Sequence, residues 1–399
     1  MEQIREKEKA EESEVCLVDP MMDLCAFLSN SGIPLSFLKT WVEKTYGSST
    51  PKRDVENIIR LLLLYSMIEA SPETISMHSL VQTVTRDQLD QTRQQAVCEQ
   101  ALGLLKGLFF YSQSTMKNIE ARKLISHVED SCHHAKDLAI EKETVFDLIN
   151  TNGLHLSDMG AYTKAREAHS YCQELGRKLW DDVDPHLAEA MHNEGNVLWS
   201  LGRLEEAKKQ LEGALSMMIQ TNSLDLLTRC KIQNNMGLVL LEQGKFREAQ
   251  KSFETAYNTC LEILPMINTL KGNALLGRIY NNLGITFQRQ GNLEAKLFFL
   301  KAMHYLTEPP TDDHALLKSV RSNLIQAKLE YKEKTHNLSK SNALNRFKKE
   351  IVEGKKVVGH EHPDIANLYN NLAQSLAKEK NYEKAIHYFK KALKIYEKM

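Results

Sequence analysis

Residues that could bind a metal or perform catalysis do not form a recognisable site in this sequence. Cys132, His133 and His134 are consecutive on an expected helix, so their side chains point in different directions and cannot share one ion. His360 and His362 lie in GHEHPDIA, which reads as a turn between helices. The motifs G-x-S-x-G and H-E-x-x-H are absent, and no Cys/His dyad motif stands out. We therefore expect no metal, no cofactor, no small-molecule substrate and no enzymatic activity.

Polar residues at a fixed distance before a small residue are a stronger signal. The position three before a Gly or Ala holds, in five copies, Asn150, His192, Asn234, Asn281 and Asn370. A carboxamide can donate to and accept from a peptide backbone, so a column of them can hold an extended segment without reading its side chains. The alternative is that this column caps or bridges adjacent repeats.

Charged residues accompany this column. The position six before the small residue holds Asp147, Glu189, Lys231, Arg278 and Asn367, while Asn196 and Arg289 stand one and five positions after it. The surface is therefore expected to change from acidic in the first two copies to basic in the later ones. The clamp of chaperone-binding repeats needs Lys in the Asn column, so we do not predict chaperone-tail binding.

The columns imply a repeated pair of helices. The small residues are Gly153, Gly195, Gly237, Gly284 and Ala373, and seven positions later stand Gly160, Gly202, Gly244, Gly291 and Lys380. Two helices of about 12–15 residues cannot bury their apolar stripes alone and must stack on neighbours. Small residues mark close helix crossings, and the later column marks a turn that needs a positive φ.

With this spacing the chain resembles the tetratricopeptide repeat in a 42-residue form, and HPDIANLYNNLAQSLAKEKNYEKAIHYFKKALKIYEK is similar to a kinesin-light-chain repeat. The resemblance covers residues 146–399. It implies a right-handed superhelix whose first helices line a concave groove that binds a protein or peptide segment. A degenerate copy is expected at 312–334, and an irregular stretch at about 328–360.

The N-terminal part follows another pattern. Residues 1–14 are a charged segment, and LCAFLSNSGIPLSFLKTW predicts two helices joined by a Gly-Ile-Pro turn. DVENIIRLLLLYSMIEA predicts a third helix that runs into a strand, SMIEASPETISMHS a hairpin with Pro72 in its turn, and LVQTVTRDQL a last helix. Residues 15–95 are thus expected to form a winged-helix-like unit, followed by connecting helices at 96–145. The fold class is all-α, with this one small β-hairpin.

The order G-I-P, L-x-x-YS and SMHSLVQTVTRDQL resembles the winged-helix segment of NB-ARC/STAND ATPases that carry tetratricopeptide repeats. The resemblance implies that His78, which follows Met77, is the remnant of a histidine that senses ADP phosphates. Ser79 stands where that family usually has Arg. Because no G-x-x-x-x-G-K-[ST] occurs, the nucleotide-binding module is missing, and we expect His78 to pack or hydrogen-bond locally.

Composition excludes several partners. The formal net charge is −1, and the expected winged helix has no basic recognition helix, so we expect no nucleic-acid binding. The longest apolar run, LLLLYSMI, is too short to cross a bilayer, and the charged N-terminus does not resemble a signal peptide. Seven cysteines without a C-x-x-C favour reduced thiols, so a cytoplasmic location is expected.

The sequence therefore predicts a non-enzymatic interaction protein, the sensor or adaptor part of a STAND-type signalling protein, that binds a protein or peptide. Two alternatives remain open. The final helix, YEKAIHYFKKALKIYEKM, has no polar capping helix after it, which would favour self-association as a scaffold. The chain could also be the remnant of a STAND ATPase that acts with a nucleotide-binding chain.

Overall fold

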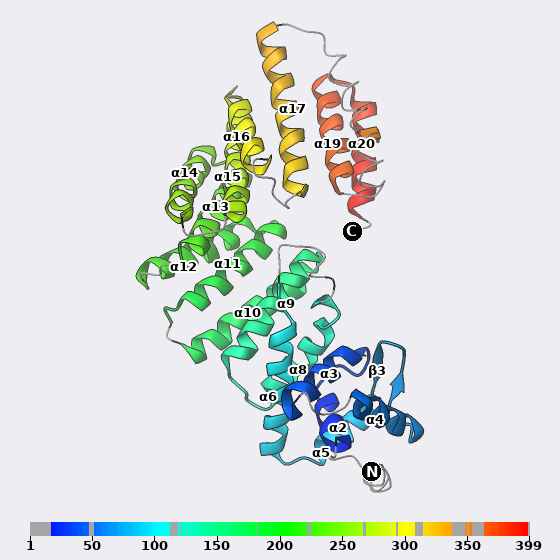
Figure 1. The fold of residues 1–399 in the computed structure, drawn as a ribbon. Helices are drawn as coiled ribbons and strands as arrows, with labels where there is room; N and C mark the ends of the chain where they lie inside the picture. The colour runs from blue at the N-terminus through cyan, green and yellow to red at the C-terminus, as the bar shows by residue number, and fades with distance from the viewer. Residues whose placement is uncertain are drawn as a thin grey trace. The chain divides into compact units, whose positions relative to one another are not determined.

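The computed structural model describes residues 17–47, 52–111, 119, 121–180, 182–221, 225–265, 269–292, 294–307, 314–336, 348, 351–352 and 363–397 (Figure 1). These residues form seventeen helices and three short strands, so the predicted all-α class is confirmed. The charged segment 1–14 lies outside the described residues. The chain divides into two compact units, 1–202 and 203–399, each of which has its own packing.

The first unit begins with short helices around a small sheet. Its elements are α2 (Val18–Ala26), β1 (Ile33–Pro34), α3 (Leu35–Tyr46), α4 (Lys52–Leu64), β2 (Glu69–Ala70), β3 (Thr74–Ser76) and α5 (Ser79–Asp87). The sheet order is β1-β3-β2, and both pairings are antiparallel. The predicted hairpin is therefore present, but a third strand joins it at the expected Gly-Ile-Pro turn. Ile33 is fully buried there and lies opposite Ile75. Burial of the Ile33 side chain against the sheet favours an extended backbone at this residue.

Connecting helices join the small sheet and its helices to the repeats. Helices α6 (Gln91–Leu108) and α8 (Ile125–Asp137) pack on each other and on α9 (Glu143–Asp158). From α8, Ser131 Oγ donates to the Phe27 carbonyl at 2.7 Å, and His127 Nδ1 accepts from the Ser29 amide at 3.2 Å. Because one apolar core runs from α2 through Phe146 of α9, the described residues of these helices share a single packed interior.

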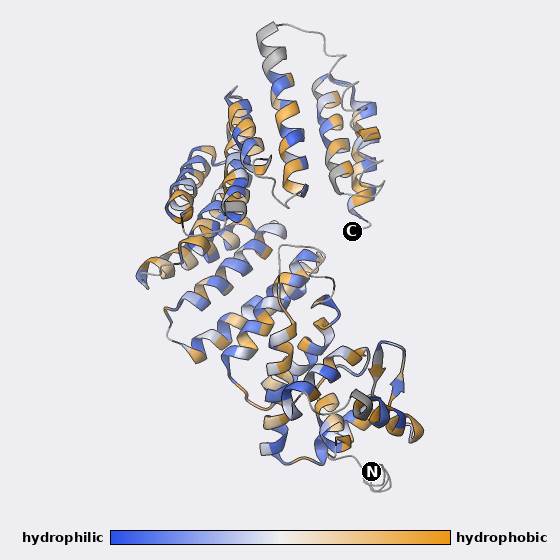
Figure 2. Ribbon diagram, viewed as in Figure 1, coloured by the Kyte–Doolittle hydropathy of each residue, from blue (hydrophilic) through white to orange (hydrophobic). Residues whose placement is uncertain are grey.

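Helix pairs make up the rest of the chain. The first unit continues with α9 (Glu143–Asp158), α10 (Tyr162–Leu179) and α11 (Pro185–Ser200). The second contains α12 (Leu204–Gln220), α13 (Leu226–Glu242), α14 (Phe246–Ile263), α15 (Thr269–Arg289), α16 (Ala295–Thr307), α17 (His314–His336), α19 (Pro363–Lys378) and α20 (Tyr382–Tyr396). Apolar and polar residues alternate along each of these helices (Figure 2), as expected where one side of a helix is covered by its neighbours.

The turn column behaves as the sequence predicts. Gly160, Gly202, Gly244 and Gly291 have φ between 72° and 77°, and Lys380 adopts 59° in the same position of the last pair. A left-handed residue ends the first helix of each pair, and Gly does so without steric cost. Lys380 shows that the geometry of the turn persists where the Gly is lost.

The small-residue column marks close helix crossings, also as predicted. A Cβ added at Gly237 would lie 2.5 Å from Phe253 Cε1, and one at Gly284 would lie 2.6 Å from Phe299 Cε1. Both aromatic rings are fully buried, so each lies directly against the backbone of its partner helix. A side chain there would force the two helices apart.

The predicted range of the irregular stretch overlaps the end of α17. Helix α17 continues to His336, within the predicted range 328–360. Between 337 and 362 only residues 348, 351 and 352 are described, so most of this prediction lies outside the described residues. None of the described helices is both long and apolar enough to cross a bilayer.

Candidate peptide-binding face

Most residues of the Asn column are buried rather than exposed to solvent. The side chains of Asn150, Asn234 and Asn281 are between 3% and 7% exposed, His192 is buried as well, and Asn370 is half-buried. These residues lie on the first helices of their pairs, where the sequence places them. Their burial means that most of their hydrogen-bonding capacity is met inside the protein.

The partners of this column are the Asn residues of the following first helix. Each such partner donates its Nδ2 to the Oδ1 of the preceding column residue, over 2.9–3.0 Å: Asn193 to Asn150, Asn282 to Asn234, and Asn323 to Asn281. We call these six residues the amide ladder. Its rungs join neighbouring first helices within each unit, which matches the bridging alternative considered for the column.

The donors of the ladder were not among the predicted site residues. Their sequence signal is a doubled polar pair, His192-Asn193 and Asn281-Asn282, in which the second residue reaches back to the previous copy. In the first unit His192 has a partner on its own helix, because Asn196 Nδ2, one turn further along, lies 3.2 Å from His192 Nε2. The predicted residues His192 and Asn196 therefore pair with each other.

The charged columns remain more accessible. Arg278 and Arg289 on α15 are exposed, and Lys231 on α13 is half-buried. Arg289 Nη2 lies 3.1 Å from Glu242 Oε1 on α13, so the two first helices are bridged at this position too. The side chain of Asn367, the last predicted member of the column, lies outside the described residues. Among these basic residues, Arg278 is thus exposed, Lys231 is partly exposed, and Arg289 is exposed but paired with Glu242.

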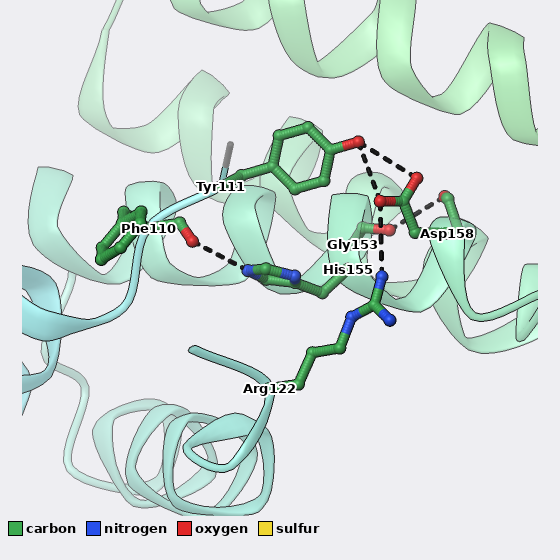
Figure 3. A network of polar contacts seen from close by, with 7 residues as sticks. Phe110, Tyr111, Arg122, Gly153, His155 and Asp158 are labelled. Atoms are coloured by element: carbon green, nitrogen blue, oxygen red, sulfur yellow. Dashed lines mark hydrogen bonds and ion pairs between the residues drawn. The ribbon is translucent and has the colours of Figure 1, made fainter. Parts of the chain in front are cut away.

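The acidic residues of the first pair already have partners within the chain, as Figure 3 shows for Asp158. Tyr111 donates its hydroxyl to the Asp158 carboxylate at 3.0 Å, and Arg122 Nη2 lies 3.5 Å from the same group. Asp147 receives Lys106 Nζ at 2.6 Å, and this hydrogen bond raises the pKa of Lys106. These contacts neutralise both carboxylates.

A buried histidine holds the segment that contains Tyr111. The His155 Nε2 atom lies 3.0 Å from the carbonyl oxygen of Phe110, and its ring contacts those of Phe109 and Tyr111 at centroid distances of 4.9 and 5.3 Å. Burial lowers the pKa of His155, so at neutral pH its neutral ring can donate to this carbonyl. The segment 109–111 is thereby held against α9.

His78 has a local role in the structure. It is the residue that caps the N-terminus of α5, where its Nδ1 accepts from the Leu80 amide at 3.1 Å, and its side chain is exposed. This contact is a local hydrogen bond of the kind that the sequence predicts for His78.

Within the described residues, no group of three or more His, Cys, Asp or Glu side chains is placed to hold a metal ion. The six described cysteines are free thiols, and all are buried. A shallow depression of about 660 Å³ is lined by Gly244, Lys245, Phe246, Arg247, Glu248, Gln250 and Gln290. It lies at the turn after α13.

Comparison with known proteins agrees with the repeat geometry. Residues 186–262 and 342–398 match the tetratricopeptide repeat family. Tetratricopeptide repeat protein 29 from Homo sapiens, like that from Macaca fascicularis, is 25% identical over 224 residues, 54% of this chain. The match spans 45% of those relatives, less than half of their length.

Solved structures of low sequence identity are similar to this chain. The Rap conjugation gene regulator of the plasmid pLS20, in complex with the Phr* peptide, has a TM-score of 0.52 at 15% identity, covering 91% of this chain and 94% of the regulator. A STAND protein with a tetratricopeptide repeat sensor from Pyrococcus horikoshii has a TM-score of 0.43 at 15% identity, covering 96% of this chain and 63% of that protein. The chain described here is an all-α array of tetratricopeptide-like repeats with a small three-stranded sheet near its N-terminus.

Proposed function

We propose that this chain is a non-enzymatic interaction protein that binds an extended, acidic protein segment across the first helices of its second unit. The observation that carries this proposal is the exposed Arg278 on α15 together with the partly exposed Lys231 on the neighbouring first helix α13. Tetratricopeptide repeats typically bind proteins or peptides, and the structurally similar Rap regulator was solved with a peptide. An acidic ligand follows from the sign of the exposed charges.

The amide ladder has a supporting role in this proposal. Since Asn234 and Asn281 are buried between helices, they fix the register of α13, α15 and α17 rather than contact the ligand. A fixed register holds Lys231 and Arg278 at a constant separation. Binding then requires less ordering of the protein, which favours affinity.

The geometry also predicts the spacing of the ligand's acidic residues. Neighbouring packed helices lie roughly 8–10 Å apart, and an extended chain advances about 3.3 Å per residue. Helices α13 and α15 are in contact, so Lys231 and Arg278 would meet acidic side chains about three residues apart. The first pair is a poorer site, because Asp147 and Asp158 already have partners within the chain.

A peptide-display selection on the full chain tests the proposal. We expect enrichment of peptides with Asp or Glu about three residues apart, and about tenfold weaker binding to the double variant Lys231→Glu/Arg278→Glu. Lys251→Glu is the matched control, since Lys251 is an exposed lysine on the second helix α14. Equal affinities for the wild type and the double variant would refute the placement of the ligand. A selection without enrichment would refute peptide binding itself.

We further propose that the array is the sensor arm of a STAND-type signalling protein. This finer assignment is supported by the segment with the winged-helix resemblance, which shares one core with the first repeat. It predicts that a P-loop module is encoded upstream of this sequence or on a partner gene. Reading the genomic sequence upstream for G-x-x-x-x-G-K-[ST] tests the first case, and co-purification with a nucleotide-binding chain tests the second.

A further inference from the structure

Helix α20 exposes a continuous row of large apolar side chains. Tyr382, Ile386, Phe389, Leu393 and Tyr396 are each between 37% and 60% exposed. We call these five residues the α20 stripe. Figure 2 shows apolar residues along the length of this helix. Five neighbouring side chains of this size are unlike the single exposed apolar residues that are normal on a protein surface, and such a patch indicates an interaction site.

Two positions of the stripe, those of Phe389 and Tyr396, are buried in the other repeats of the second unit. Phe389 occupies the column of Leu211, Phe253 and Phe299, all of which are fully buried. In those repeats the second helices α12, α14 and α16 each pack against the next first helix, α13, α15 or α17. At the position of Leu393, Tyr257 of α14 contacts Tyr280 of the next first helix, α15, with ring centroids 5.4 Å apart, so the α20 stripe includes a position that receives another helix in this fold.

The spacing of the stripe specifies a helical partner. Its residues are separated by four, three, four and three positions, which is the a/d pattern of a coiled-coil seam over two heptads. A helix with the same pattern fills this seam best, and α20 itself has that pattern. A second copy of the chain is thus sterically suited to the stripe.

Charges beside the stripe select one arrangement of two copies. Glu383, Lys390 and Glu397 follow one edge at seven-residue intervals and are exposed, while Ala385 and Ala392 follow the other edge and are buried. A parallel pair would place these charges against alanines. An antiparallel pair would instead place the charged edges of the two helices together.

Two antiparallel registers fill the seam equally well. In one, Ile386 faces Tyr396 of the second copy. Glu383 then meets Glu397 of the other copy, and the two Lys390 side chains meet each other, so like charges repel. In the other, Ile386 faces Phe389, and Glu383 of each copy meets Lys390 of the other, which gives two ion pairs. Only the second register combines apolar contact with opposite charges.

We propose that the α20 stripe is a self-association surface, on which α20 of a second copy packs antiparallel with Glu383 of each copy beside Lys390 of the other. The surface lies on the second helix of its pair and does not use the basic residues proposed to bind a ligand. Because the seam is shorter than a standard interface, the dimer is expected to dissociate in the micromolar range.

Sedimentation equilibrium of the full chain between about 1 and 200 µM tests this inference. We expect the wild type to move from monomer to dimer over this range. Leu393→Glu should remain monomeric, and circular dichroism should confirm that it folds, since Leu393 is 55% exposed. Lys384→Glu is the control, because Lys384 is exposed on the same helix away from the stripe, and it should dimerise as the wild type does.

A charge exchange tests the register. Glu383→Lys alone and Lys390→Glu alone should each weaken dimerisation about tenfold, because each places like charges together twice. The double variant Glu383→Lys/Lys390→Glu should recover the wild-type dissociation constant. A wild type that stays monomeric at the highest concentration would overturn the proposal, as would a double variant no better than the single ones.

Discussion

Removal of one amide-ladder acceptor should destabilise the second unit more than any exposed Asn substitution. In Asn234→Ala the Nδ2 of Asn282 loses the acceptor that it reaches over 2.9 Å. Both side chains are at most 5% exposed, so water cannot replace the lost oxygen. A buried donor left without an acceptor costs about 1–3 kcal/mol. We therefore expect the free energy of unfolding to fall by about 2 kcal/mol, or about 4–8 °C in melting temperature for a unit of this size.

The design uses a matched control and a double-mutant cycle. Asn258 is exposed on α14, so Asn258→Ala should change the free energy of unfolding by less than about 0.5 kcal/mol. Asn234→Ala/Asn282→Ala removes donor and acceptor together. It should therefore cost less than the sum of the two single substitutions, by about 1 kcal/mol.

The assay should distinguish the two units. Repeat arrays need not unfold in one step, so urea denaturation should be combined with hydrogen exchange of peptides from α13 and α15. Protection should fall in these helices and stay unchanged in α2–α6. Strictly additive single effects, or a loss for Asn234→Ala no larger than for Asn258→Ala, would show that the rungs do not couple neighbouring helices.

Two further substitutions test the packing and the pH dependence. Gly237→Ala places a methyl group 2.5 Å from the Phe253 ring and should lower the free energy of unfolding by about 1–3 kcal/mol, measured by thermal unfolding. The control Gly103→Ala lies in an open helical position and should raise the free energy of unfolding by about 0.5–1 kcal/mol. Burial lowers the pKa of His169 to about 4. As the pH drops, the histidine of the unfolded chain is therefore protonated before that of the folded chain. The free energy of unfolding should fall by about 3 kcal/mol between about pH 6.5 and pH 4. His169→Phe keeps an aromatic ring beside Gly153 and should remove this part of the acid sensitivity; identical pH profiles for wild type and variant would contradict that assignment.

The repeat geometry was predictable because it is local. A turn that needs positive φ and a crossing that tolerates only small residues leave fixed columns in the sequence, and the φ values of Gly160 and Lys380 confirm the first of these. The third strand of the sheet was not predictable in this way. Ile33 and Pro34 form β1 only because Ile75 and Thr74 lie opposite them, and that pairing spans about forty residues of chain.

The candidate site shows the same division. The sequence places Asn234 and Asn281 on the first helices but cannot tell a residue that faces the ligand from one that faces the next helix. That difference is a small rotation about the helix axis, and it is set by the packing of α13, α15 and α17. The doubled pair Asn281-Asn282 is the one local feature that favours the bridge, since a ladder needs a donor next to each acceptor.

The ladder also limits where ligand specificity can reside. An Asn that already accepts from its neighbour over 2.9 Å cannot turn toward a peptide without leaving a buried donor unsatisfied. Ligand discrimination must therefore come from columns whose side chains reach solvent, and in the second unit these include Arg278 and Arg289. In the first unit the corresponding Asp158 is held by Tyr111 and Arg122. A ligand that recruits the first repeat would have to replace these contacts with donors of its own, so basic residues in a ligand should add affinity only when Tyr111 and Arg122 are removed.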